Sequence, residues 1–181
     1  MSIYNLGMEN QQSGRLRVFW VIFIAIAAFA GCAHSPLLTT EPIEKGWIER
    51  STLEGPAHQE FKFGYDTATA QAPFLPMLRT VNSGVETIVF LGTWCSDSRR
   101  HVPHFLKVAD LTGLPAASIK LYCVDRSKKS DDGLTDSYKI EKVPTFIFQK
   151  NGKEIGRIIE SPQLSMEQDM LTIFSQAEAK P

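Results

Sequence analysis

One cysteine of this chain stands where a fold can expose and activate a thiol. Cys95 follows the apolar run Ile88 to Leu91 and directly precedes a segment whose apolar residues have helical spacing. The free N–H groups and the macrodipole at a helix amino terminus stabilise a thiolate, the form of cysteine that attacks disulfides. Arg99, one turn on, adds a positive charge. The Asp97 carboxylate disfavours a negative charge on Cys95. Its alternative roles are to relay a proton or to accept a hydrogen bond from a substrate N–H. The pattern predicts a nucleophilic thiol.

The residue three positions after this thiol decides what kind of exchange it can perform. Ser98 carries a hydroxyl that can hydrogen-bond a thiolate but cannot form a disulfide with it. Cys95 is therefore predicted to be a monothiol. A mixed disulfide formed at Cys95 must then be resolved by another thiol, either in the substrate or in a small molecule.

The remaining candidates for cysteine or metal chemistry are weaker. Cys123 lies in the apolar run 119–124 and is interpreted as a small buried residue, although a disulfide with Cys95 stays open if the two Cα atoms lie within about 7 Å. His101 and His104 are spaced for one helix face, but Pro103 stands between them and no fourth ligand is evident. We therefore predict no metal site and no cofactor.

The elements that must position Cys95 alternate between strand and helix. A nearly continuous apolar, β-branched run at 87–93 indicates a central strand, and Asn151-Gly152 is typical of a hairpin turn. Ser165 with Gln168 forms a possible capping box for a last helix. The predicted order is a strand at 61–65, a helix at 73–81, a strand at 87–93, a helix at 96–111 bent at Pro103, a strand at 119–124, a helix at 134–140, a hairpin at 145–159 and a helix from 165 to 177. This order predicts an α/β fold with a mixed sheet.

Composition limits the chain to one ordinary core. It has 181 residues, of which 43% are hydrophobic and 22% charged, and its formal net charge is −1. This size and composition favour a single globular domain, and the charge gives no indication of a nucleic-acid partner.

The amino terminus is expected to lie outside that core. Arg15 and Arg17 precede an uncharged apolar stretch, Val18 to Ala30, which is shorter than the roughly 20 residues of a membrane-spanning helix and indicates an export signal. The segment Phe29 to Cys32 resembles the lipobox of bacterial lipoproteins, which implies a lipidated Cys32; ordinary secretory cleavage nearby is the alternative. We therefore expect a signal peptide at 1–31, a lipidated tether at 32–58 and a folded domain at 59–181.

Four features in this order resemble the thioredoxin superfamily over about residues 60 to 178. They are Trp94-Cys95, the proline eight residues after the cysteine, the loop Lys142-Val143-Pro144-Thr145 and the Asn-Gly hairpin. The run Trp94 to Ser98 is similar to a bacterial thioredoxin-like subgroup with a Trp-Cys-x-Asp-Ser motif. The resemblance implies the thioredoxin fold, with a central mixed β-sheet flanked by helices on both faces.

The resemblance also implies roles for single residues. Pro144 is expected to be cis and to bring the Val143 backbone beside the thiol, where it can pair with an extended substrate segment. Trp94 is expected to shield one side of the thiol, with a core aromatic as the alternative interpretation. Ser98 occupies the position of the family's resolving cysteine, and Val89 that of its buried acidic residue, so fast autonomous reduction is not expected.

Two functions follow from these expectations. The first is a thiol-disulfide oxidoreductase, monothiol or isomerase-like, anchored through Cys32 on the periplasmic side of a bacterial cell envelope. In it Cys95 and Ser98 act on protein disulfide or thiol substrates held at Trp94, Asp97, Val143 and Pro144, and an external reducing thiol completes the cycle. The alternative is a non-catalytic binding module of the same fold that holds a partner protein or a thiol adduct.

Overall fold

A five-stranded mixed sheet organises the chain in a computed structural model that describes residues 42–179. The strands are β1 (Gly46–Ile48), β2 (Val85–Leu91), β3 (Ile119–Cys123), β4 (Thr145–Lys150) and β5 (Lys153–Ile159), in the spatial order β1-β3-β2-β4-β5. β2 pairs with β3 in parallel and with β4 in antiparallel register, and β4 pairs with β5 in a hairpin. The predicted α/β fold is confirmed.

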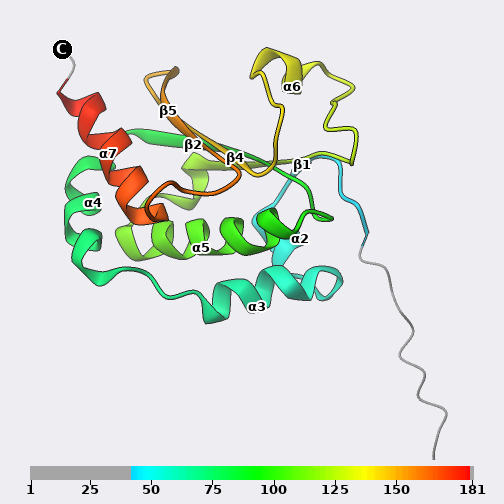
Figure 1. Cartoon of the computed structure of the whole chain (residues 1–181), viewed down its shortest axis with the longest axis horizontal. Coiled ribbons are helices and arrows are strands. Elements are labelled where there is room, and N and C mark those ends of the chain that lie inside the picture. Colours follow the sequence, from blue (N-terminus) through cyan, green and yellow to red (C-terminus); the bar gives the residue numbers. More distant parts are fainter. Residues whose placement is uncertain (1–41, 180–181) are drawn as a thin grey trace, which may run out of the picture. The chain divides into compact units, whose positions relative to one another are not determined.

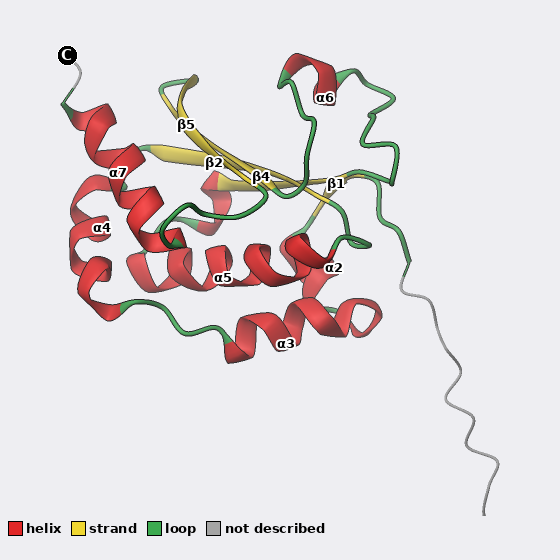
Figure 2. Ribbon diagram, viewed as in Figure 1, coloured by secondary structure: helices red, strands yellow, loops and turns green. Residues whose placement is uncertain are grey.

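Helices cover the two faces of this sheet unequally (Figures 1 and 2). One face carries α2 (Arg50–Glu54), α3 (Gln59–Thr67), α4 (Leu75–Val81), α5 (Ser96–Thr112) and α7 (Met166–Glu178), and the other carries the short α6 (Leu134–Ser137). Three short 3-10 turns, Pro56–His58, Ala72–Phe74 and Ala116–Ser118, join these elements. α5 connects the parallel strands β2 and β3, which is the crossover that such a pair requires.

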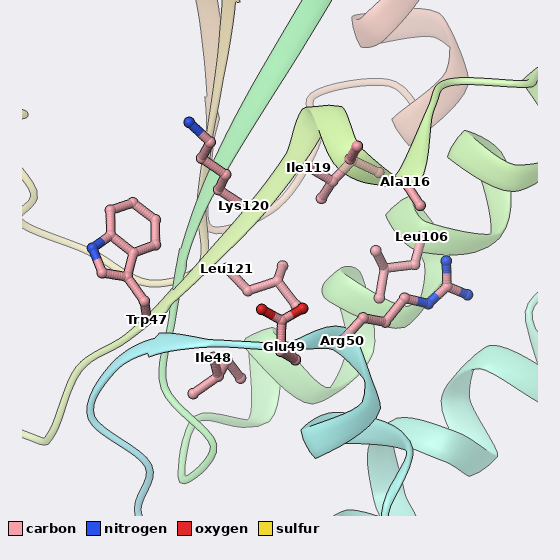
Figure 3. A pocket seen from close by; sticks show the side chains of 10 residues that line it. Trp47, Ile48, Glu49, Arg50, Leu106, Ala116, Ile119, Lys120 and Leu121 are labelled. Carbon is pink, nitrogen blue, oxygen red and sulfur yellow. The ribbon is translucent and has the colours of Figure 1, made fainter.

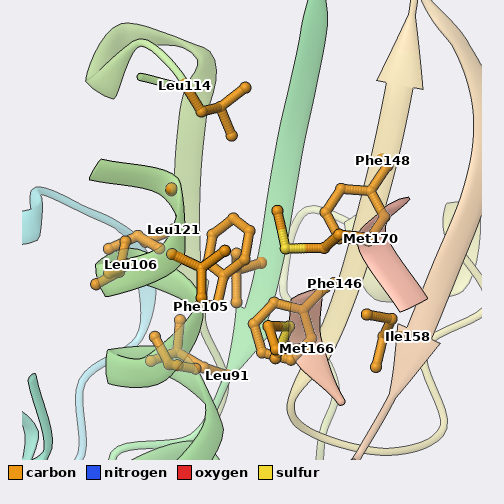
Figure 4. Packing of buried hydrophobic residues seen from close by; sticks show 14 of the residues in the cluster. Leu91, Phe105, Leu106, Leu114, Leu121, Phe146, Phe148, Ile158, Met166 and Met170 are labelled. Carbon is orange, nitrogen blue, oxygen red and sulfur yellow. The ribbon is translucent and has the colours of Figure 1, made fainter. Parts of the chain in front are cut away.

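Alternate residues of β2 belong to two separate clusters of buried apolar side chains. Val89 and Leu91 face the larger cluster, which α5 and α7 close with Phe105 and Met170 (Figure 4). Phe90 faces the smaller cluster, which includes residues of β3 and of the segment around α6. Burial on both faces explains why this strand has a nearly unbroken apolar sequence.

Local signals in the last third of the chain predicted its structure well. Asn151 and Gly152 have φ angles of 53° and 72° in the hairpin turn, as the Asn-Gly pair predicted. The Ser165 side chain accepts a hydrogen bond from the Gln168 backbone N–H at 3.1 Å and so caps α7. The helix at 134–140 is shorter than predicted and ends at Ser137.

The predicted strand at 61–65 is wrong, because these residues belong to α3. Phe61, Phe63 and Tyr65 alternate as a strand would, but the helix turns Phe61 inward and leaves Phe63 69% exposed. Gly64 lets α3 lie close to α5, since a Cβ there would sit 3.0 Å from Cγ of Pro103. Pro103 is itself buried, and α5 stays helical through it.

The predicted tether contains part of the fold. β1 pairs in antiparallel register with Leu121–Cys123 and makes one edge of the sheet, and α2 follows it. The expected domain boundary at residue 59 therefore falls inside the folded unit. The expected signal peptide, Cys32 and the first part of the expected tether lie outside the described residues.

Candidate active site

The predicted nucleophile lies at the junction between β2 and α5. Cys95 is the N-cap residue of α5, with extended backbone angles (φ −92°, ψ 126°), and it is half-buried. Its carbonyl accepts the Arg99 N–H at 3.1 Å, and its own N–H donates to the Gly92 carbonyl at 3.0 Å. The thiol thus stands at the amino terminus of a 17-residue helix, as predicted.

The structure brings Cys95 together with the predicted proline loop. The Val143–Pro144 peptide bond is cis, as expected, and the Cys95 thiol donates to the Val143 carbonyl across 3.3 Å. Thr145 donates to the Lys142 carbonyl and the Glu160 N–H donates to the Pro144 carbonyl, each at 2.7 Å. These bonds hold the cis-proline loop, whose Val143 carbonyl accepts the hydrogen bond from the thiol.

Ser98 is fully buried, and its hydroxyl is used within the loop rather than on the thiol. The hydroxyl oxygen accepts the Gly92 N–H at 3.2 Å, which ties the end of β2 to the first turn of α5. Cys95 and Ser98 therefore have different partners in this structure. The bond to Gly92 uses a lone pair of the Ser98 oxygen and does not use its hydroxyl proton.

Trp94 is held beside the end of β3. Its indole N–H donates to the Val124 carbonyl at 2.9 Å, and the Arg126 guanidinium lies 5.0 Å from its ring centroid. A Cβ at Gly92 would come within 2.7 Å of the same ring, so glycine is required for this packing. No sequence motif indicated Arg126, which the structure adds to the edge of the site.

Asp97 and Arg99, the two charged residues predicted to lie near the thiol, are both in α5. Asp97 is half-buried in the first turn of α5. The Arg99 guanidinium donates to the Thr93 carbonyl and to the Glu60 carboxylate, both at 2.7 Å. Arg99 therefore braces the loop before the thiol and joins it to α3.

Cys123 and Val89 are both buried in the core beneath this site. Cys123 is 1% exposed and carries a free thiol, and burial raises its pKa to about 12 with a smaller contribution from Glu44. Its interpretation as a buried apolar residue is confirmed. Val89 is fully buried, so the position of the family's acidic residue offers no proton acceptor.

Three polar residues that sequence reasoning missed fasten the N-terminal segment to the loop before Cys95. The Thr93 hydroxyl donates to the Pro42 carbonyl at 2.9 Å and accepts the Glu44 N–H at 3.2 Å. The Glu44 carboxylate lies 3.0 Å from Nε2 of His58, a fully buried ring. These contacts span 14 to 51 residues, so no local motif indicates them.

His104 lies beside a carboxylate of α7. Its Nε2 lies 3.0 Å from a carboxylate oxygen of Glu167, which is fully buried in the first turn of α7. Within residues 42–179, no group of three or more His, Cys, Asp or Glu side chains is placed to hold a metal ion.

A hollow of about 460 Å³ lies away from the thiol, at the β1 edge of the sheet (Figure 3). Trp47, Ile48 and Arg50 line one side of it, and Ile119 and Leu121 of β3 line the other. It contains none of the predicted site residues.

Over the described part of the chain, no helix is long and apolar enough to cross a bilayer.

Comparison with known proteins places these features in a family. The chain is 24% identical over 98 residues to a thioredoxin-like protein of Acanthamoeba polyphaga mimivirus, a match that covers 54% of this chain and 69% of the viral protein. It is 26% identical over 92 residues to thioredoxin H9 of Arabidopsis thaliana, covering 51% of this chain and 61% of the plant protein. The chain thus spans about three fifths of that plant relative.

Among solved structures, a Pseudomonas aeruginosa protein of unknown function has the same fold, with a TM-score of 0.57 and 14% identity over 72% of this chain and 93% of that protein. The sequence model of a family described as thioredoxin matches residues 56–175, which include Cys95, Ser98 and the cis-proline loop. This chain therefore belongs to the thioredoxin family.

Proposed function

We propose that this protein is a monothiol-type thiol-disulfide exchange protein, anchored by lipid at Cys32 on the extracytoplasmic side of a bacterial envelope. The observation that carries the proposal is the meeting of the Cys95 thiol with the Val143 carbonyl and cis-Pro144 at the amino terminus of α5. A half-buried thiol at a helix start, beside a fixed backbone edge, can react with an extended segment that contains a disulfide.

The exchange proceeds by two thiolate attacks. The Cys95 thiolate attacks one sulfur of a substrate disulfide; a new bond joins Cys95 to that sulfur, and the other sulfur leaves as a thiolate that takes up a proton. A second thiol, from the substrate or from a small molecule, then attacks the mixed disulfide and releases Cys95. If the second thiol belongs to the substrate, the result is isomerisation. If it is external, a further thiol equivalent is needed to complete a net reduction.

In this proposal the protein needs that second thiol because of the residues at positions 98 and 89. Ser98 cannot displace the bound substrate, because a hydroxyl does not form a disulfide. The buried Val89 supplies no carboxylate to accept a proton during release. In this proposal Ser98 stabilises the thiolate, and Trp94, Asp97, Val143 and Pro144 contact the substrate.

Trapping the mixed disulfide tests this function. The protein is incubated with an oxidised peptide that contains one disulfide, and turnover is followed with and without added glutathione. We expect a covalent adduct in both cases, turnover only with glutathione, and neither in Cys95→Ser. Turnover without an added thiol would contradict the monothiol mechanism.

The buried Val89 together with the absence of a resolving cysteine also favours a second candidate, a binding module that retains a partner. The same experiment separates the two. A binding module would hold the peptide equally well in Cys95→Ser, without a covalent adduct and without turnover.

A further inference from the structure

The segment Pro42–Lys45, here called the strap, is fastened directly beside the active-site loop. Thr93 lies two residues before Cys95 and is fully buried. Its hydroxyl donates to the Pro42 carbonyl and accepts the Glu44 N–H, so one side chain holds two points of the strap backbone. Breaking these two part-buried bonds is costly, because it leaves the fully buried Thr93 hydroxyl without a hydrogen-bond partner.

Two further contacts hold the strap in this place. The Glu44 carboxylate pairs with the fully buried His58, and Lys45 forms an ion pair with Asp125 at the carboxyl end of β3. The chain then continues into β1, which joins the sheet next to β3. The strap thus enters the domain at the end of the sheet where β2 leads to Cys95, not at the hairpin end.

This point of entry limits how far the thiol can lie from Cys32. Pro42 is ten residue steps after Cys32, and a chain spans at most 3.3–3.6 Å per residue, which gives about 36 Å. The bond to Thr93 and the two residues from Thr93 to Cys95 add roughly 10 Å. Cys95 therefore stays within about 45 Å of Cys32, whatever path the intervening residues take.

Residues at the opposite end of the sheet, near the hairpin, can lie farther from Cys32 than Cys95 can. Thr145 pairs with Phe90 near the site, whereas Lys150 pairs with Val85 and leads into the hairpin, so β4 runs away from the thiol. Its six residues add about 20 Å, since a strand rises about 3.3 Å per residue. Lys153, exposed at the start of β5, therefore reaches about 65 Å from Cys32.

We propose that the strap holds the active-site end of the domain towards the membrane, so that its substrates are disulfides and thiols of envelope proteins close to the bilayer surface. The inference rests on the proposed lipid anchor at Cys32. The volume open to a tethered group grows with the cube of its reach. Cys95 should therefore encounter surface-bound groups roughly threefold more often than a thiol at the hairpin end.

The test uses the full lipidated protein in vesicles with maleimide on a fraction of the lipid headgroups. One sample carries native Cys95 and the other carries Cys95→Ser with Lys153→Cys, while Cys123 is buried in both. Each rate of labelling by the headgroup maleimide is divided by the rate with soluble N-ethylmaleimide, which removes differences in intrinsic reactivity. Insertion of a 30-residue Gly/Ser segment after residue 38 provides a matched control with a long flexible tether.

We expect the normalised rate to be about threefold higher for Cys95, and the ratio to approach one with the long tether. Equal or reversed rates in protein whose Cys32 lipid is verified by mass would overturn the inference and leave the exchange function untouched. Protein without lipid on Cys32 would overturn both the inference and the proposed membrane anchor.

Discussion

Replacing Glu167 by Gln removes a buried charge whose hydrogen bond with His104 ties α7 to α5. The Glu167 side chain is fully buried; one carboxylate oxygen lies 3.0 Å from His104 Nε2 and accepts the Gln71 N–H at 3.1 Å. The other oxygen has no hydrogen-bond partner within residues 42–179. Glu167→Gln preserves the shape of the side chain but not its charge.

The size of the effect follows from the pKa of Glu167. Burial raises this pKa, but hydrogen bonds from His104, from the Glu167 N–H and from the Gln71 N–H outweigh burial and lower the pKa from 4.5 to about 2. A difference of this size between the unfolded and folded states corresponds to about 3 kcal/mol of stability. Because the folded-state value is lower, this stability is present above about pH 4.5 and is lost as the pH falls towards 2.

Urea unfolding followed by circular dichroism at pH 7, 5, 4 and 3 measures the difference between the parent and Glu167→Gln. We expect a loss of about 3 kcal/mol at pH 7 that shrinks steadily below about pH 4.5. Glu178→Gln, in the exposed last turn of the same helix, is the matched control and should cost no more than about 1 kcal/mol. Equal losses in both variants, or a loss in Glu167→Gln that is independent of pH, would refute this reasoning.

Three further substitutions test the loop around Cys95. Gly92→Ala places a Cβ 2.7 Å from the Trp94 ring, so we expect a shifted tryptophan emission and a loss of about 1–3 kcal/mol in urea unfolding. Thr93→Val keeps the side-chain shape but removes the hydroxyl that bonds the Pro42 carbonyl and the Glu44 N–H, so hydrogen exchange in the strap should accelerate at a cost of about 1 kcal/mol. Ser98→Cys should form a disulfide with Cys95 on oxidation and reduce a peptide disulfide without added glutathione, as a thiol assay would show.

A different result would contradict each of these three predictions. Unchanged emission in Gly92→Ala would mean that the Trp94 ring does not lie against this glycine. Unchanged exchange in Thr93→Val would mean that the strap is held by other contacts. A Ser98→Cys protein that keeps all its free thiols after oxidation would show that this position does not face Cys95 closely enough for a bond.

The site loop was predictable because short sequence patterns determine it. An unbroken apolar strand followed by a helix pattern placed Cys95 at the junction between β2 and α5, and Val143-Pro144 marked the second loop. The meeting of these two loops came from the family resemblance. Neither pattern alone specifies the contact between residues 48 positions apart.

The errors arose where tertiary packing outweighs local pattern. Phe61, Phe63 and Tyr65 have the spacing of a strand, but docking on α5 makes a helix more favourable and leaves one aromatic side chain in solvent. β1 has only three residues, and its register depends on a partner strand more than 70 positions away. The Thr93–Glu44–His58 contacts are likewise long-range, and their residue types are equally common in loops.

The most direct test of the central claim is the mass of the protein lipidated on Cys32 after reaction with oxidised glutathione, measured for the parent, Cys95→Ser and Cys123→Ser. We expect one glutathione adduct on the parent and on Cys123→Ser, released by added thiol, and no adduct on Cys95→Ser. An adduct that persists in Cys95→Ser, or an internal disulfide between Cys95 and Cys123 in place of the adduct, would contradict a monothiol function for Cys95.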